Sequence, residues 1–109
     1  MFLVVGGKRL CGTIEVGCAK NAVLPILAAA ILTDEPVTIE DCPKLLDAYN
    51  MMSILKTLGC RVEMRDRDIV LDASMAESHE MPEHLSKRLR SSIFMLGPLI
   101  GRFRRAKVT

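Results

Sequence analysis

A long apolar segment that begins shortly after a glycine turn constrains this chain more than any other feature. Residues 22–32 are apolar apart from one proline, and Gly17 stands five positions before them. A helix start exposes free backbone N–H groups and the positive end of the helix dipole, so Lys20 and Asn21 at this start predict an anion-binding site. The alternative is a solvated loop lysine beside an ordinary asparagine N-cap.

The composition is that of a small globular domain. The chain has 109 residues, of which 50% are hydrophobic and 26% charged, so it can bury the core of one modest domain. The apolar segment contains Pro25 and is too short to cross a bilayer, and no basic–apolar–cleavage pattern opens the chain. We therefore expect a cytoplasmic protein that has no membrane partner.

Neither the charge nor the cysteines indicate a specialised partner. The net charge is +2 and aromatic residues are few, so nucleic-acid binding is not supported, although basic residues cluster at 87–90 and 102–105. The four cysteines form no Cys-x-x-Cys pair, and no histidine stands at ligand spacing from them. We expect free thiols in a reducing compartment, and neither a metal nor a cofactor.

Periodicity predicts an alternation of strands and helices. Strands are expected at residues 2–5, 10–16, 37–40, 61–64 and 68–71, and helices at residues 21–33, 46–58 and from Pro82 or Ser86 onward. Gly59 is expected to end the second helix, and Gly97-Pro98 to kink or interrupt the last one. The order β-β-α-β-α-β-β-α predicts an α/β fold with the first two helices on one side of the sheet.

Three blocks of sequence follow one another in a specific order: residues 16–29, residues 32–37 followed by 43–47, and residues 86–99. In this order and register they resemble the UDP-N-acetylglucosamine enolpyruvyl transferases (1-carboxyvinyltransferases), which catalyse the first committed step of peptidoglycan synthesis. The resemblance extends over nearly the whole chain but covers only the opening portion of that family, so an N-terminal fragment is expected. The sister family that acts on shikimate 3-phosphate is the alternative enzyme, and its signature around the lysine is richer in Ser and Arg.

The resemblance implies a partial inside-out α/β barrel of the enolpyruvyl transferase type. In that family two domains are each built from repeated β-α-β-α-β-β units, and residues 20–72 would supply one such unit. Residues 1–18 would be strands that belong to the second domain of the complete enzyme. Residues 19–109 would form an incomplete first domain, which places Lys20 and Asn21 at the crossing between the two domains, where the family's substrates bind.

The resemblance also assigns roles to individual residues. Lys20 and Asn21 match the pair that faces phosphoenolpyruvate, and Arg90 matches the arginine that contacts UDP-N-acetylglucosamine. Without the family, Arg90 is either an unfavourable cation in the first turns of a helix that starts near Ser86, or part of a solvated middle turn. Asp47 matches an acidic position of the family, although a lone aspartate there is also typical of a helix start.

The reaction implied is transfer of the enolpyruvyl group to the 3′-hydroxyl of the sugar, by addition and elimination through a tetrahedral intermediate with loss of phosphate. The family's catalytic cysteine lies on a loop that would come after Thr109, so no catalytic residue is assigned and the fragment alone is expected to be inactive. Cys18 stands where the family has a glycine, and we interpret it as a small turn residue, although a lysine and a helix start beside it would lower its pKa.

Two non-enzymatic alternatives stay open. The chain could be an interaction module that docks a partner, or self-associates, through exposed apolar faces at Ile93, Leu96 and Ile100. A weaker alternative is a small basic RNA-binding module, whose binding would depend strongly on salt.

Overall fold

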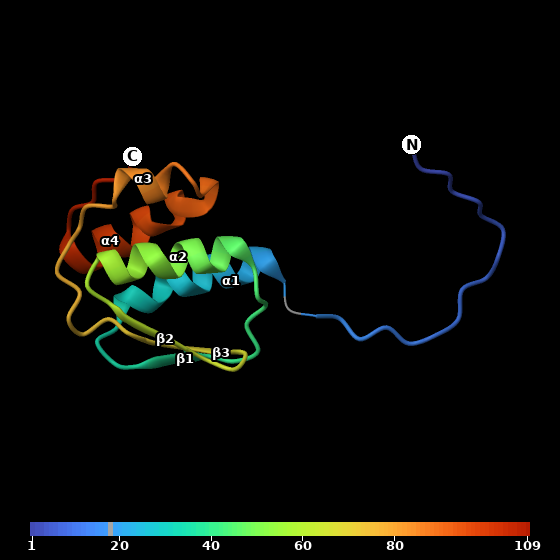
Figure 1. The fold of residues 1–109 in the computed structure, drawn as a ribbon, viewed down its shortest axis with the longest axis horizontal. Coiled ribbons are helices and arrows are strands. Elements are labelled where there is room, and N and C mark those ends of the chain that lie inside the picture. Colours follow the sequence, from blue (N-terminus) through green and yellow to red (C-terminus); the bar gives the residue numbers. More distant parts are fainter. Residues whose placement is uncertain (18) are drawn as a thin grey trace.

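The chain divides into an extended arm and a folded body (Figure 1). The structure is a computed structural model and describes residues 1–17 and 19–109. The arm, residues 1–17, contains no strand, so the strands expected at residues 2–5 and 10–16 are wrong for this chain. A strand needs a neighbour to satisfy its backbone N–H and C=O groups. The arm finds none among the described residues, and all seventeen of its residues are exposed.

A three-stranded antiparallel sheet forms one side of the body. Its strands are β1 (Val37–Ile39), β2 (Arg61–Arg65) and β3 (Asp68–Asp72), in the spatial order β1-β3-β2. β2 and β3 form the expected hairpin, with Val62 opposite Leu71, and β1 pairs with the other edge of β3, with Val37 opposite Leu71. The three strands predicted within the body are therefore confirmed.

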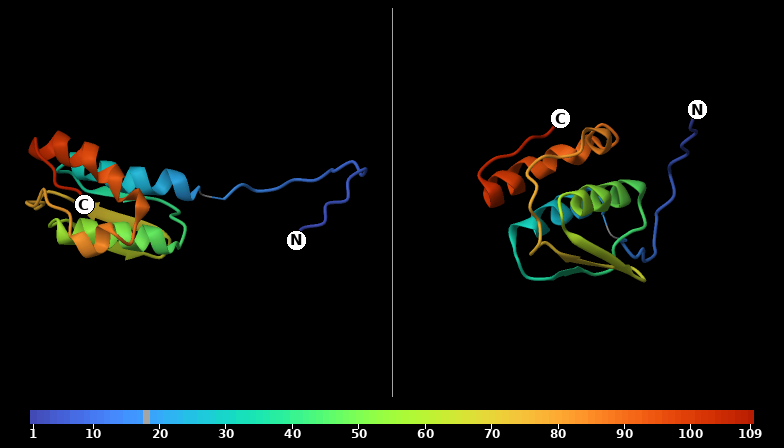
Figure 2. Two further views of the ribbon diagram at one scale, coloured as in Figure 1. Left: turned by 90° about the horizontal axis from the view of Figure 1, so that it is seen from above. Right: turned by 60° about the vertical axis from the view of Figure 1, so that its left-hand side comes forward.

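Two helices cover one face of this sheet, as predicted. They are α1 (Lys20–Ala29), which continues as the 3-10 helix η1 (Ala30–Leu32), and α2 (Leu46–Thr57). Figure 1 and the right-hand view of Figure 2 place them on the same side of the strands. Gly59 follows α2 with a φ of 102°, a left-handed conformation that glycine adopts without steric cost, so the predicted helix end is confirmed.

The single last helix that the sequence predicts is divided into three elements, of which the last two are continuous in the chain. These are α3 (Glu83–Ser86), the 3-10 helix η2 (Arg90–Met95) and α4 (Leu96–Phe103). The chain breaks at Leu89, whose backbone is extended (φ −130°, ψ 106°) and whose side chain is 1% exposed. Burial of this one leucine turns the backbone out of a helical path. Gly97 and Pro98 lie in the first turn of α4, where a missing N–H is tolerated, so they do not interrupt it.

The core lies between the sheet and the helices, and it extends outward to the C-terminal pieces. α1 packs against both α2 and η2, so it is the central element of the body (Figure 2). The fully buried side chains come from every layer: Leu27, Ile31, Met51, Ile54, Leu55, Ile69, Leu71, Met95 and Leu99. Successive side chains of a strand point to opposite faces of the sheet, so every second residue of β2 lies on the face away from the helices. These residues are charged and exposed to solvent: Arg61, Glu63 and Arg65.

The end of the chain adds one more contact to the body. Lys107 forms an isolated parallel bridge with Glu80, and the Met81 N–H donates to the Lys107 carbonyl at 3.0 Å. Within the described residues, no helix combines the length and the apolar character needed to cross a bilayer.

Candidate functional site

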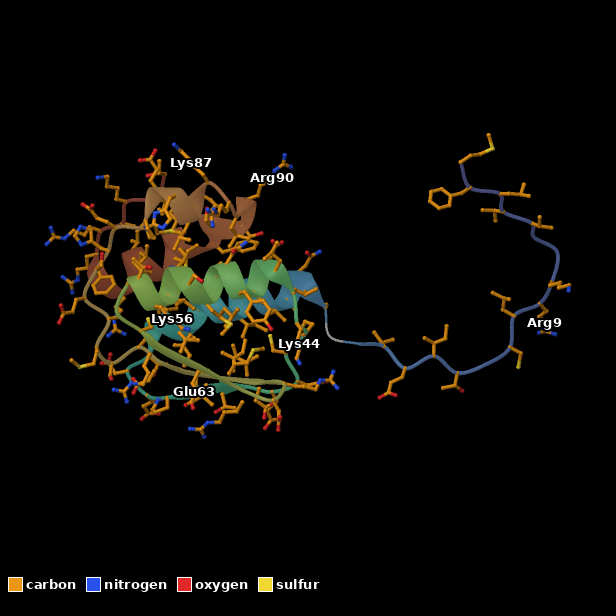
Figure 3. The ribbon with its side chains drawn as sticks, in the orientation of Figure 1. Arg9, Lys44, Lys56, Glu63, Lys87 and Arg90 are labelled. Carbon is orange, nitrogen blue, oxygen red and sulfur yellow. The ribbon has the colours of Figure 1, made fainter. Side chains whose placement is uncertain are left out.

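The N-terminal ends of α1, α2 and η2 lie at the same end of the body, where the arm joins it (Figure 1). We call this the helix-start end and define it by the first residues of the three elements, Lys20, Leu46 and Arg90. Figure 3 shows Arg90 and Lys44 at this end, whereas Lys56 lies towards the other end of α2. The fold therefore gathers two of the predicted substrate-binding segments, which are 69 positions apart in the sequence, into one region.

Lys20 and Asn21 are the first two residues of α1. Ala19 is the N-cap, and its carbonyl accepts hydrogen bonds from the N–H groups of Ala22 and Val23 at 3.1 and 3.3 Å. Asn21 is therefore inside the first turn and exposed, and the expectation that it is an N-cap is wrong. For Lys20 only the place in the helix is described, and Cys18, predicted to be a small turn residue, lies outside the described residues.

Among the described residues, the N-cap side chains of α1 and α2 do not cap their helices. The N-cap residues Ala19 and Leu45 make no side-chain hydrogen bond to the first turn. The first N–H groups of each helix have no intrahelical partner, and their partial positive charge is not offset by an N-cap side chain. The first turn of α1 contains no acidic residue, so this helix start is favourable to an anion, and Arg90 adds a cation at the same end of the body.

Arg90 is the first residue of η2 and is exposed. Lys87, which the sequence groups with it, has a different environment: it lies at the C-cap of α3 and pairs with Glu83 one helical turn earlier. A cation at a helix C-terminus is favourable, so the positive charge of Lys87 is accounted for without a bound ligand. The structure thus separates Arg90 from its basic neighbour, and Figure 3 shows the Arg90 side chain directed away from the body.

Asp47 lies in the first turn of α2 and is half-buried. A carboxylate at this position interacts favourably with the positive end of the helix dipole. The position of Asp47 is therefore consistent with the interpretation that it stabilises the start of α2. The same position puts Asp47 at the helix-start end of the body. An acidic group there would position a substrate hydroxyl or a cationic side chain and would not bind a phosphate.

The three described cysteines differ in environment. Cys11 is exposed in the arm, and Cys42 and Cys60 are buried, and none of the three takes part in a disulfide among the described residues. Burial raises the pKa of Cys60 to about 11, while the charge of Arg102 opposes this rise and that of Asp72 adds to it. The Cys60 group is therefore a protonated thiol at neutral pH. A hollow of about 390 Å³ beside Gly59 and Cys60 is lined by none of the predicted site residues.

No cluster of three or more His, Cys, Asp or Glu side chains that could hold a metal occurs in the described part of the chain. The helix-start end carries hydrogen-bonding and cationic groups from α1 and η2, together with the Asp47 carboxylate of α2. It can bind and orient anionic groups and stabilise negative charge that develops on them.

Sequence reasoning missed the role of Arg102. It placed this residue in a basic surface cluster at 102–105, but the Arg102 side chain is only 15% exposed and hydrogen-bonds with residues near the end of η1. Arg104 and Arg105 are exposed, as a surface cluster requires. No local sequence signal separates the three arginines, because the partners of Arg102 are about 70 positions away.

The comparisons with known proteins find relatives along almost the whole chain. The family model of EPSP synthase (3-phosphoshikimate 1-carboxyvinyltransferase) matches residues 4–109. Among curated relatives, the UDP-N-acetylglucosamine 1-carboxyvinyltransferase 2 of Caldanaerobacter subterraneus is 46% identical over 108 residues, and the UDP-N-acetylglucosamine 1-carboxyvinyltransferase of Sodalis glossinidius is 45% identical over 108 residues. In both cases the match covers 99% of this chain and 26% of the relative, so the chain spans about a quarter of their length.

A solved structure is similar as well. The enolpyruvyl transferase NikO from Streptomyces tendae superposes with a TM-score of 0.72 at 28% identity, over 87% of this chain and 22% of that one. The mixed helix-and-strand body is thus part of an α/β enolpyruvyl transferase fold, as the resemblance implied. The family match over almost the whole length and the identity to curated relatives lead to one conclusion: the chain belongs to the EPSP synthase family of enolpyruvyl (carboxyvinyl) transferases.

Proposed function

We propose that this chain is the N-terminal part of a UDP-N-acetylglucosamine 1-carboxyvinyltransferase of cytoplasmic peptidoglycan synthesis. The reaction would transfer the enolpyruvyl group of phosphoenolpyruvate to the 3′-hydroxyl of UDP-N-acetylglucosamine, with release of phosphate. The observation that carries the proposal is that α1 and η2, which begin at Lys20 and Arg90, both start at the same end of the body. The curated relatives with this name, at 46% and 45% identity, support the choice of acceptor.

Both proposed substrates carry the charge that the helix-start end favours. Phosphoenolpyruvate carries a phosphate and a carboxylate, and UDP-N-acetylglucosamine a diphosphate. In the proposal Lys20 and Asn21 bind the phosphoenolpyruvate, and Arg90 binds the sugar nucleotide. Lys20 then neutralises the phosphate as it becomes the leaving group, which is the kind of preorganised electrostatic stabilisation that contributes most to many enzymatic rates.

The arm and the body have different places in this proposal. Residues 1–18 supply strands to the second domain of the complete enzyme, and residues 19–109 form part of the first domain. Large apolar side chains recur along the exposed arm, including Val4, Leu10, Ile14 and Val16. Such a segment is suited to pair with a sheet that this chain does not contain.

A chimaera tests the proposed function. The 109 residues replace the matching segment of the Caldanaerobacter transferase, and phosphate release from phosphoenolpyruvate is measured with UDP-N-acetylglucosamine as acceptor. We expect activity in the chimaera and none in the 109-residue chain alone. Lys20→Ala should lower kcat/KM about 100-fold or more, as loss of a preorganised catalytic donor does. Asn21→Ala tests the second residue of the pair in the same assay.

Arg90→Ala should lower kcat/KM for UDP-N-acetylglucosamine by about 10- to 100-fold, the value of a charge-assisted hydrogen bond. Arg105→Ala is the matched control, because Arg105 is exposed and lies beyond the end of α4. A folded chimaera without phosphate release would contradict the proposal, and so would an Arg90 variant as active as the control. Release with shikimate 3-phosphate in place of the sugar nucleotide would favour the sister activity.

The isolated chain should also self-associate. Ile93, Phe94, Leu96 and Ile100 are 38–56% exposed on η2 and α4, and such apolar surface favours association. Sedimentation at increasing concentration should show oligomers or aggregates. A monomer that melts cooperatively at all concentrations would instead favour a self-sufficient interaction module.

A further inference from the structure

Two helical segments lie alongside each other and share a direction. The first helical segment is α1 with η1 (Lys20–Leu32), and the second helical segment is η2 with α4 (Arg90–Phe103). η2 packs against α1, and α4 packs against η1. Both begin at the helix-start end and finish at the opposite end of the body (Figures 1 and 2). At 1.5 Å per residue, each segment is about 20 Å long.

Arg102 joins the two segments at their far ends. Its Nη1 donates to the Ile31 carbonyl at 2.8 Å and to the Thr33 carbonyl at 3.4 Å, and its Nη2 donates to Asp34 Oδ1 at 2.7 Å. The guanidinium carbon also lies 5.6 Å from the centre of the Phe103 ring. One half-buried side chain thus contacts the end of η1, the loop that follows it and its own helix.

The acceptors explain why an arginine is needed here. Carbonyls in the last turn of a helix have no intrahelical donor, and the helix C-terminus carries partial negative charge. The planar guanidinium can satisfy two carbonyls and a carboxylate at once, which an ammonium cannot do with the same geometry. Asp34 is 77% exposed, so the bonds to the carbonyls contribute more than the ion pair does.

The remaining contacts between the segments fix their separation better than their alignment. The fully buried side chains of the two segments include Leu27, Ile31, Met95 and Leu99, and apolar packing has little directional preference. Gly101 allows close approach, since a Cβ there would lie 3.0 Å from Leu32 Cδ2. Directional bonds from Arg102 therefore determine how far the second segment slides or rotates against the first.

We propose that Arg102 is a positioning residue for the helix-start end. By clamping the far end of the second helical segment to η1, it sets the place of Arg90 relative to the start of α1. Its effect on substrate binding rests on the proposed function, because Arg90 and the α1 start are the proposed substrate contacts. Its effect on the alignment of the segments does not depend on any substrate.

A distance measurement tests the clamp directly. Nitroxide labels are placed at Ala22→Cys in the first turn of α1 and Ile93→Cys in η2, both exposed positions, with Cys11 and Cys18 changed to Ser. Pulsed EPR then gives the distribution of distances between the labels in the 109-residue chain, which is diluted with unlabelled chain so that distances between associated chains do not contribute. We expect a narrow distribution with Arg102, and a broader or shifted one in Arg102→Met. Arg105→Met is the control, because Arg105 is a nearby exposed arginine, and it should leave the distance distribution unchanged.

Milder variants keep the test decisive if Arg102→Met does not fold. Asp34→Asn removes the ion pair and keeps the carbonyl bonds, so it should broaden the distribution only slightly. Arg102→Lys keeps the positive charge but loses the planar guanidinium with its two donor nitrogens. The width of its distance distribution should therefore lie between those of Asp34→Asn and Arg102→Met. A distribution as narrow in Arg102→Met as in the parent, or, if that variant does not fold, as narrow in Arg102→Lys, would overturn the proposal.

Kinetics of the chimaera supply the second readout. Arg102→Met should raise KM for UDP-N-acetylglucosamine about tenfold, equivalent to one misaligned charged contact, while KM for phosphoenolpyruvate changes little because α1 is held by α2. Equal changes in both KM values would overturn the positioning role. A chimaera that is inactive even with Arg102 would refute the proposed function alone, and the EPR result would still decide the clamp.

Discussion

The arm and the body are both rich in apolar side chains, and they differ in what those side chains contact. Leu10 in the arm is 94% exposed, whereas Leu27 in α1 is fully buried between the other helices and the sheet. Local composition alone does not explain this contrast, since Leu3 in the arm stands within the apolar residues 2–5 and is still 89% exposed. The contrast shows that burial depends on partners supplied by topology: the body contains its own, and the arm does not.

The largest expected difference between the two regions is in core packing. Leu27→Ala should lower the free energy of unfolding by about 2–5 kcal/mol, because it leaves a cavity that the neighbours of α1 only partly fill. Leu10→Ala should change it by less than about 0.5 kcal/mol, as for an exposed position. Urea unfolding followed by circular dichroism measures both. If Leu10→Ala lowered the free energy of unfolding as much as Leu27→Ala does, the arm would have to pack on the body.

Thiol chemistry provides the next contrast. Cys11 in the arm should react with iodoacetamide at least about 100-fold faster than Cys60 at pH 8, since Cys60 is buried and reacts only on opening of the body. Peptide-resolved mass spectrometry measures the two rates. Similar rates would mean that the region around Cys60 opens freely.

The pH dependence of Cys60 follows from the direction of its pKa shift. The folded state raises the pKa from 9.0 to about 11, so it holds the thiol proton more tightly than the unfolded chain does. This contribution to stability is complete below pH 9 and is lost as the pH rises towards 11. A Cys60→Ala variant should therefore lose less stability over this range than the parent in the same urea experiment.

A smaller contrast concerns two glycines with nearly the same backbone conformation. Gly59 after α2 has φ 102°, and Gly7 in the arm has φ 100°. An added Cβ at Gly59 would lie 2.9 Å from the Met75 carbonyl oxygen, whereas nothing lies within 4 Å at Gly7. Gly59→Ala should therefore cost about 1–3 kcal/mol of unfolding free energy, and Gly7→Ala close to none, because the arm can change its conformation.

Local patterns predicted most of the body. The strands, the two helices that cover the sheet and the end of α2 at Gly59 follow from periodicity and from one residue that tolerates a positive φ. Two features depend on the tertiary structure and were missed. Leu89 breaks the last helix because the core buries it, and Arg102 leaves the surface because η1 offers it carbonyls.

The candidate site divides in the same way. The helix start at Lys20 and Asn21 could be predicted from the residues around it, and the structure places both in the first turn of α1. The nearness of Arg90 to that start could not, because it results from packing of η2 against α1. From the sequence, only the resemblance to enolpyruvyl transferases connects Lys20 and Asn21 with Arg90.

Amide hydrogen exchange along the chain tests the central claim most directly, which is that the arm lacks a partner here and gains one in the complete enzyme. In the 109-residue chain we expect residues 1–17 to exchange at once, while β3 and α2 are protected. In the chimaera the same arm residues should become protected, because they pair with strands of the second domain. Protection of the arm in the isolated chain, or exchange without protection in the folded chimaera, would contradict the account.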